Sequence, residues 1–243
     1  MNIGDALAER LAPGRRRGIE LLDDPATDAA LATRSLQDVA RSNRWFGGAS
    51  AVIAELAPML AAARDRGTPL TPLTLLDVGT GAGDIPELAR HTAGRGGVPL
   101  FTMGLEVTPA LAAASRPRSG DAIVGTALAL PFANRSIDIV TCSQVLHHFE
   151  AAEGARLIAE MHRVARVRVI VSDIRRAWAA AAGFWVSSWA LGFHPVSRHD
   201  GVVSVLRGFR AHELSAAVFG ATGCRPSVRN RRGFRVTASW TPA

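Results

Sequence analysis

The chain has 243 residues and a formal net charge of +7, a length that suits one α/β domain with a small helical addition. Its hydrophobic fraction of 48% and charged fraction of 20% exclude a disordered or low-complexity chain. All 28 basic residues are arginine, because the sequence contains no lysine. This compositional bias explains the positive charge as readily as a nucleic-acid partner does, so a nucleic-acid partner is disfavoured.

The cysteines, the N-terminus and the longest apolar stretch indicate the cellular compartment of the protein. Cys142 and Cys224 lie far apart without metal-ligand spacing, so we expect no disulfide framework and no metal site. The N-terminus lacks the pattern of a signal peptide, and the longest apolar stretch, residues 178–193, is shorter than a membrane-spanning helix. These features predict a cytoplasmic protein.

The first region of the chain is predicted to be helical. Residues 28–41 repeat apolar side chains at the spacing of one helical face, and Gly47 and Gly48 then end that helix. A second helix is expected over about 49–66. We assign residues 1–66 to an N-terminal helical lid.

The middle region alternates short apolar runs with helical stretches, which is typical of a parallel sheet covered by helices on both faces. The expected strands are 73–78, 100–106, 122–125, 137–143 and 167–172. The expected helices are 85–92, 109–116 and 153–164.

The last region begins with a long excursion from Asp173 to about residue 209, followed by a helix over 211–222. Two extended runs, 226–230 and 234–240, flank a turn at Arg232 and Gly233. The sequence therefore predicts a Rossmann-like α/β domain over 67–243. Its seven-stranded, mostly parallel sheet would end in an antiparallel hairpin, with an insertion at about 174–210.

A glycine-rich turn follows the first expected strand, in the run Asp77-Val78-Gly79-Thr80-Gly81-Ala82-Gly83-Asp84. Glycine permits a tight turn and brings a ligand close to backbone N–H groups at a helix start. Glu106 ends the next strand, 23 positions after Gly83, where a carboxylate can hold both hydroxyls of a ribose. The pattern indicates a nucleotide-type ligand and leaves a dinucleotide site open.

Residues 73–171 resemble the class I S-adenosylmethionine-dependent methyltransferases of the small-molecule type. The resemblance rests on the glycine turn, on residues 104–109, on residues 129–140 and on the segment Cys142-Ser143-Gln144-Val145-Leu146-His147-His148-Phe149. It implies S-adenosyl-L-methionine as cofactor. The residues it implies for cofactor binding are Asp77, Gly79, Thr80, Gly81, Gly83, Asp84, Glu106, Val107, Thr126, Ala127 and Ser143.

One position departs from the pattern of this family. Relatives usually carry an aspartate where this chain has Thr126, so the hydrogen bond to the adenine amine must come from Thr126, a backbone group or water.

The tail resembles a subgroup of bacterial methyltransferases found beside polyketide and quinone-type pathways. The similar segments are Arg175-Arg176, residues 194–201 and 204–207, together with residues 22–25 and Asn43-Arg44 near the N-terminus. They imply a role in secondary metabolism and a specialised acceptor.

Methyl transfer to a hydroxyl group requires a base, and His199 beside Asp200 is our first choice, because a carboxylate can fix the imidazole tautomer. A purely structural His-Asp pair is an equal alternative. His147, just after the fourth strand, is the rival base, and His148 is expected near the acceptor.

The aromatic run 178–193 is predicted to bind a flat or lipophilic acceptor. A buried helix, a dimer contact and shallow seating at a membrane surface stay open as alternatives. The expected acceptor-binding residues are Arg44, His148, Trp185, Arg198 and Arg207.

The working hypothesis is O-methylation of a phenol, quinol or polyketide-type hydroxyl. C-methylation of a quinone-precursor ring, RNA methylation and a non-catalytic cofactor-binding module are the alternatives. The sequence leaves the acceptor and the oligomeric state open.

Overall fold

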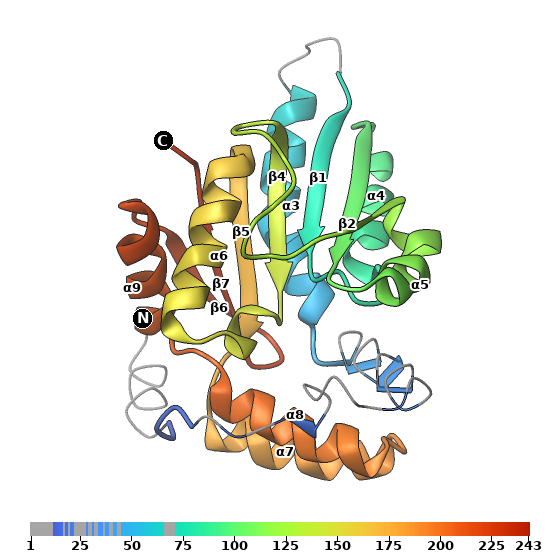
Figure 1. Cartoon of the computed structure of the whole chain (residues 1–243), viewed down its shortest axis with the longest axis vertical. Helices are drawn as coiled ribbons and strands as arrows, with labels where there is room; N and C mark the ends of the chain where they lie inside the picture. Colours follow the sequence, from blue (N-terminus) through green and yellow to red (C-terminus); the bar gives the residue numbers. More distant parts are fainter. Residues whose placement is uncertain are drawn as a thin grey trace.

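A seven-stranded sheet forms the centre of the molecule (Figure 1). The structure is a computed structural model that describes residues 12–16, 18, 20–21, 28, 31, 34–35, 37–38, 41–42, 45–65 and 71–243. The strands are β1 (Leu73–Val78), β2 (Leu100–Glu106), β3 (Asp121–Val124), β4 (Ile137–Ser143), β5 (Ala165–Ile174), β6 (Ser227–Arg231) and β7 (Arg235–Trp240), in the order β3-β2-β1-β4-β5-β7-β6. Among these strands β7 alone runs in the opposite direction to the others, so the predicted mixed sheet with a terminal hairpin is confirmed.

Helices cover both faces of the sheet, as the alternating pattern predicted. One layer holds α3 (Gly48–Asp65), α4 (Asp84–Arg95) and α5 (Pro109–Ser119), and the other holds α6 (Ala151–Val164) and α9 (Ala211–Thr222). Alternate strand residues serve opposite layers: Leu75 packs with α3 and α4, whereas its neighbour Leu76 joins the cluster beneath α6 and α9. The sheet is therefore buried on both faces.

The position of helix α3 differs from the predicted boundary of the N-terminal lid. It was assigned to a lid over residues 1–66, yet Val52, Leu56 and Leu60 are buried against β1, β4 and β5. An apolar helix face of this kind stabilises the fold more when it is buried against a sheet than when it stays partly exposed to solvent. The helix is thus a layer of the sheet domain.

The excursion after β5 folds as two helices, α7 (Trp178–Ala190) and α8 (Pro195–Arg207). They pack on each other beyond the carboxyl ends of the parallel strands, at the bottom of Figure 1. Gly201 permits their close approach, since a Cβ there would lie 2.1 Å from the Phe184 ring. Among the described helices, none has the length and apolar character needed to cross a bilayer.

The described residues near the N-terminus run along α8 and tie it to the rest of the chain. Arg207 Nε donates to the carbonyl of Gly18 at 2.9 Å, and the N–H of Arg16 donates to the Leu206 carbonyl at 3.2 Å. The buried Arg176 donates to the Pro13 carbonyl at 2.8 Å. This segment and the two inserted helices therefore form one unit beyond the carboxyl ends of the strands.

Two glycines of one helix provide a matched test of the glycine turn. Gly83 has a φ of 73°, and a Cβ there would lie 2.8 Å from the backbone nitrogen of Ser119. Gly83→Ala is expected to lower the free energy of unfolding by more than about 2 kcal/mol, because left-handed strain adds to a backbone clash. Gly94 lies inside α4 with open space around it, so Gly94→Ala should raise that free energy by about 0.5–1 kcal/mol. Urea unfolding measures both changes, and equal effects would contradict the assigned strain.

Candidate active site

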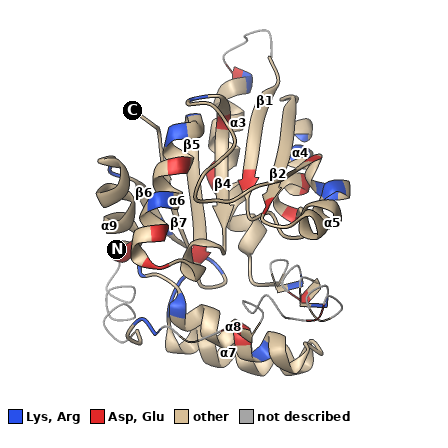
Figure 2. Ribbon diagram, in the orientation of Figure 1, with Lys and Arg blue, Asp and Glu red and all other residues tan. Residues whose placement is uncertain are grey.

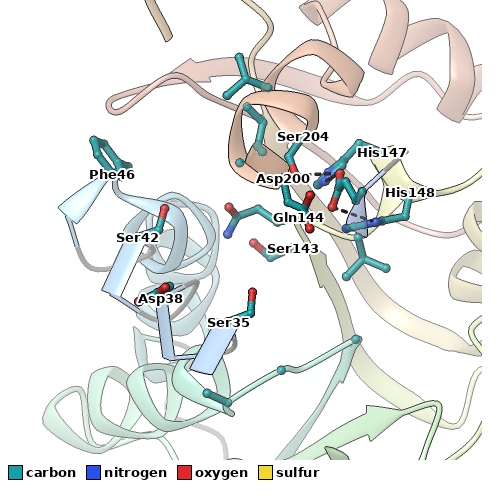
Figure 3. Close-up of a pocket in the computed structure, with 18 of the residues that line it drawn as sticks. Ser35, Asp38, Ser42, Phe46, Ser143, Gln144, His147, His148, Asp200 and Ser204 are labelled. Carbon is teal, nitrogen blue, oxygen red and sulfur yellow. Dashed lines mark hydrogen bonds and ion pairs between the residues drawn. The ribbon is translucent and has the colours of Figure 1, made fainter. Parts of the chain in front are cut away.

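A cavity of about 750 Å³ lies at the carboxyl ends of β1, β2 and β4. The glycine turn after β1 forms one wall, while α7, α8 and N-terminal residues form the other. In the close-up of Figure 3, Phe46 and Ser35 lie across the cavity from Ser143 and His147. The strand order reverses here, between β2 and β4 on either side of β1, which is where open α/β sheets bind ligands.

The glycine turn offers bare backbone to the cavity. Gly79, Gly81 and Gly83 all have left-handed φ angles, of 69°, 57° and 73°. A Cβ on Gly79 would meet Val145 at 2.5 Å, whereas one on Gly81 would meet nothing within 4 Å. The first position thus needs glycine for packing, and the second faces open space that a ligand can fill.

Glu106 connects the end of β2 to this turn. Its Oε1 accepts the N–H of Gly81 at 2.6 Å, and its carboxylate lines the cavity. Burial raises the pKa of Glu106, while the N–H groups of Gly81 and Val107 act in the opposite direction. A partly desolvated carboxylate in this position is suited to accept hydrogen bonds from a diol.

Most residues expected to bind the cofactor line the cavity together. They are Gly79, Thr80, Gly81, Asp84, Glu106, Val107, Thr126, Ala127 and Ser143. Asp77 and Gly83 do not line it. Asp77 is buried beneath the turn, where Thr141 Oγ1 donates to its carboxylate at 2.7 Å.

A histidine and an aspartate form a buried pair in the wall of the cavity. His147, in the short 3₁₀ helix η2 (Leu146–His148), places Nδ1 2.7 Å from Asp173 Oδ1 at the end of β5. Burial raises the pKa of Asp173, but the charge of His147 and its hydrogen bond outweigh this, so the pKa lies below its usual value. Among the described residues, none provides a hydrogen-bond partner for the buried His147 Nε2, and the ring lines the cavity.

Glu20 brings a carboxylate from the N-terminal segment to the same place. Its Oε1 lies 4.0 Å from His147 Nε2 and accepts hydrogen bonds from Ser204 at 2.8 Å and Arg207 at 3.1 Å. Figure 3 shows His147, His148 and Ser204 gathered on this side of the cavity. The polar end of the cavity thus combines groups from η2, α8 and the N-terminal segment.

Comparison with known proteins agrees with this geometry. Residues 76–171 match the methyltransferase domain family. An uncharacterised methyltransferase of Mycolicibacterium gilvum is 34% identical over 152 residues, which are 60% of this chain and 51% of that protein. The chain spans about half the length of the curated relatives it matches.

Two solved structures share the fold. The magnesium protoporphyrin IX methyltransferase of Synechocystis PCC 6803 with bound SAH has a TM-score of 0.52 and 14% identity, over 90% of each chain. A SAM dependent methyltransferase of Aquifex aeolicus also has a TM-score of 0.52 and 14% identity, over 74% of this chain and 87% of that one. Over residues 76–171 the chain is similar to the methyltransferase domain family, and it has the fold of S-adenosylmethionine-dependent methyltransferases. The predicted fold is therefore confirmed, and the matches agree with the predicted enzyme class and with S-adenosyl-L-methionine as cofactor.

The methyltransferase domain places the first-choice base away from the cavity. His199 Nδ1 lies 2.8 Å from Asp200 Oδ1, as a His-Asp pair requires, but the His199 side chain is 51% exposed and does not line the cavity. Asp200 does line it, and its Oδ1 also accepts the N–H of Leu21 at 2.9 Å. This geometry favours an anchoring role for Asp200 and does not support His199 as the base.

The expected acceptor-binding residues are also distributed differently. His148 lines the cavity, whereas Trp185 is 53% exposed and its neighbour Phe184 lines the cavity instead. Arg198 and Arg207 do not line it, although Arg207 holds Glu20. Arg44 and Asn43 lie outside the described residues.

Three side chains at the polar end of the cavity could also hold a metal ion. Glu20, His147 and His148 each offer one ligand atom, and these atoms lie within 4.8 Å of one another. Arg207 already pairs with Glu20 Oε1, and a second cation at that oxygen would be repelled. The expectation of metal-independent chemistry stays a prediction.

Sequence reasoning missed Asp173, Glu20 and Ser204. Asp173 had a local signal, since a carboxylate that ends an apolar strand lies at the ligand-binding edge of the sheet. Ser204 had only its place in the similar segment 204–207, and Glu20 had no signal, because only the folded chain brings the N-terminal segment onto α8.

Asp77 gives the methyltransferase domain a pH dependence. Burial raises the pKa of Asp77 to about 7, although the hydrogen bond from Thr141 lowers it. The folded-state pKa exceeds the unfolded one, so the stability provided by the protonated form is complete below the unfolded pKa and is lost as pH rises through about 7.

Asp77→Asn removes this loss. Its stabilising effect relative to the parent should therefore be larger at about pH 8 than at about pH 5, by about 2 kcal/mol. Chemical denaturation at the two pH values measures the difference, with Asp65→Asn at an exposed carboxylate as control. A pH-independent effect of Asp77→Asn would refute the assigned shift.

Proposed function

We propose that the whole protein is an S-adenosylmethionine-dependent methyltransferase that methylates a hydroxyl group of a small aromatic or lipophilic acceptor, with His147 as general base. One observation carries the proposal. His147 and the glycine turn line the same cavity, and the buried carboxylate of Asp173 orients the His147 ring. Within the described part of the chain, Nε2 of this ring has no hydrogen-bond partner.

The residues around the glycine turn fit the cofactor. The open space before Gly81 can take its methionine portion, and Glu106 its ribose hydroxyls. Ser143 Oγ is buried in the cavity wall without a hydrogen-bond partner among the described residues, so a bound ligand would satisfy it. When bound, the cofactor supplies an electrophilic methyl group on a sulfonium.

Asp173 determines what His147 can do. Its ionised carboxylate accepts a hydrogen bond from Nδ1–H, so the neutral ring keeps its lone pair on Nε2, which can take the proton of an acceptor hydroxyl. The carboxylate of Glu20, 4.0 Å from Nε2, would stabilise the imidazolium that forms. The acceptor oxygen, deprotonated in this way, is the nucleophile for the methyl group.

The rest of the cavity suits a flat apolar acceptor. The Phe184 ring lies 5.9 Å from that of Phe46 and 6.0 Å from that of Phe193, and all three line the cavity. An apolar cluster opposite a polar end matches a phenol, quinol or polyketide-type hydroxyl. These are acceptors of secondary or quinone metabolism in the cytoplasm. C-methylation of an activated ring would use the same base.

The base assignment predicts a difference between two histidines. His147→Gln and Asp173→Asn should each lower kcat by about 10²-fold or more, because proton transfer loses its acceptor or its orientation. His199→Ala should stay within about twofold of the parent, since that ring lies outside the cavity. Formation of S-adenosylhomocysteine with a panel of phenols and quinols provides the assay. The reverse ranking would return the role to His199.

The cofactor site is tested separately by calorimetry. Glu106→Gln should weaken S-adenosylmethionine binding about tenfold or more, because it removes a charge-assisted acceptor for the ribose hydroxyls. Glu153→Gln, at an exposed carboxylate of α6, is the matched control and should bind like the parent. Binding without turnover on any acceptor would favour a non-catalytic module, and chelator sensitivity of turnover would favour a metal at Glu20, His147 and His148.

A further inference from the structure

Helix α7 has an unusual composition for a helix at the surface. The chain contains no Asp, Glu, Lys or Arg from residue 177 to residue 197, so the helix is apolar all round. Its two serines donate to backbone carbonyls of the same helix, Ser187 to Gly183 at 2.6 Å and Ser188 to Trp185 at 2.7 Å. Helices of this kind are ordinarily covered on every side by protein or lipid.

One face of α7 is nevertheless exposed. Trp178, Trp185, Val186 and Trp189 are 54%, 53%, 62% and 61% exposed, and their spacing puts them on one side of the helix. The opposite side, with Ala180, Ala181 and Ser188, is buried against the rest of the insertion. We call the four exposed residues the tryptophan face.

Arginines border the tryptophan face. The Arg198 guanidinium lies 3.8 Å from the centre of the Trp189 ring, and that of Arg16 lies 5.9 Å from the centre of the Trp178 ring. Arg34 reaches the end of α7, where it donates to the Gly192 carbonyl. The one carboxylate within α7 and α8 is the buried Asp200, and Figure 2 shows no acidic residue along α7.

We propose that the tryptophan face binds the surface of an anionic phospholipid bilayer. Tryptophan rings favour the interface between headgroups and acyl chains, and the bordering arginines can contact lipid phosphates. A second copy of the chain fits less well, because a two-fold contact would bring arginines together without exposed carboxylates on these helices to pair with them.

The same helix borders the cavity mouth. Ala179 and Gly183 are exposed and also line the cavity, so the opening lies beside the tryptophan face. A lipophilic acceptor dissolved in the bilayer could therefore enter without crossing water. This second step rests on the proposed function, whereas bilayer binding does not.

Vesicle co-sedimentation tests the binding with the full chain. Phosphatidylcholine vesicles containing phosphatidylglycerol should retain the protein, and pure phosphatidylcholine vesicles should retain about tenfold less, with an effect that weakens as salt rises. Trp185→Ser combined with Trp189→Ser should lower retention by about tenfold or more, because two half-exposed rings lose their apolar partner phase.

A matched control uses another exposed aromatic residue. Phe219 is 49% exposed on α9, with Arg225 5.9 Å from its ring centre, so Phe219→Ser removes similar chemistry from a different side of the molecule. It should leave retention unchanged. Thermal melting and S-adenosylmethionine affinity equal to those of the parent would show that the double variant is folded.

Two results would overturn the proposal. One is retention that is absent, or equal in the parent and the double variant. The other is a dimer in the vesicle-free parent that the double variant loses, which would assign the face to a second copy. A protein that binds vesicles but forms no S-adenosylhomocysteine would leave bilayer binding standing and count against the proposed function alone.

Discussion

A fully buried carboxylate, that of Asp173, determines how the His147 ring faces the cavity. Its Oδ1 accepts from His147 Nδ1 and from the N–H of Ile174, both at 2.7 Å, and its Oδ2 accepts the N–H of His147 at 3.1 Å. A buried charge is costly unless it is paired and hydrogen-bonded in this way. Since β5 carries the carboxylate and the turn after β4 carries the ring, the contact holds the imidazole with Nε2 facing the cavity.

The fold was largely predictable because the signals for it are local. Short apolar runs predicted the strands β1, β2 and β4 at their observed bounds, and the helix predicted over residues 211–222 is α9. The face that α3 covers was not predictable. Its apolar stripe shows that one side is buried, but the partner surface, Leu75, Ile139 and Ile170, comes from three different strands, two of them far along the chain.

The same distinction divides the candidate site. The cofactor side follows from one short motif and a strand-end carboxylate, so most expected residues line the cavity. For the predicted base, the adjacency of His199 and Asp200 in the sequence was misleading. Successive helical residues point about 100° apart, so α8 directs Asp200 inward and His199 outward. The pair whose imidazole does line the cavity, His147 with Asp173 behind it, is separated by 26 positions.

Hydrogen bonds also connect the polar end of the cavity to the inserted helices. Arg176, 2% exposed, donates to Pro13, Gly208 and Glu213, which joins the N-terminal segment, the end of α8 and the start of α9. Helix α8 in turn carries Ser204 and Arg207, which hold the Glu20 carboxylate near His147. Helix α7 packs on α8, so packing and these hydrogen bonds connect it to the polar end of the cavity, whereas the glycine turn lies between β1 and α4. The two walls of the cavity are therefore built from different parts of the fold.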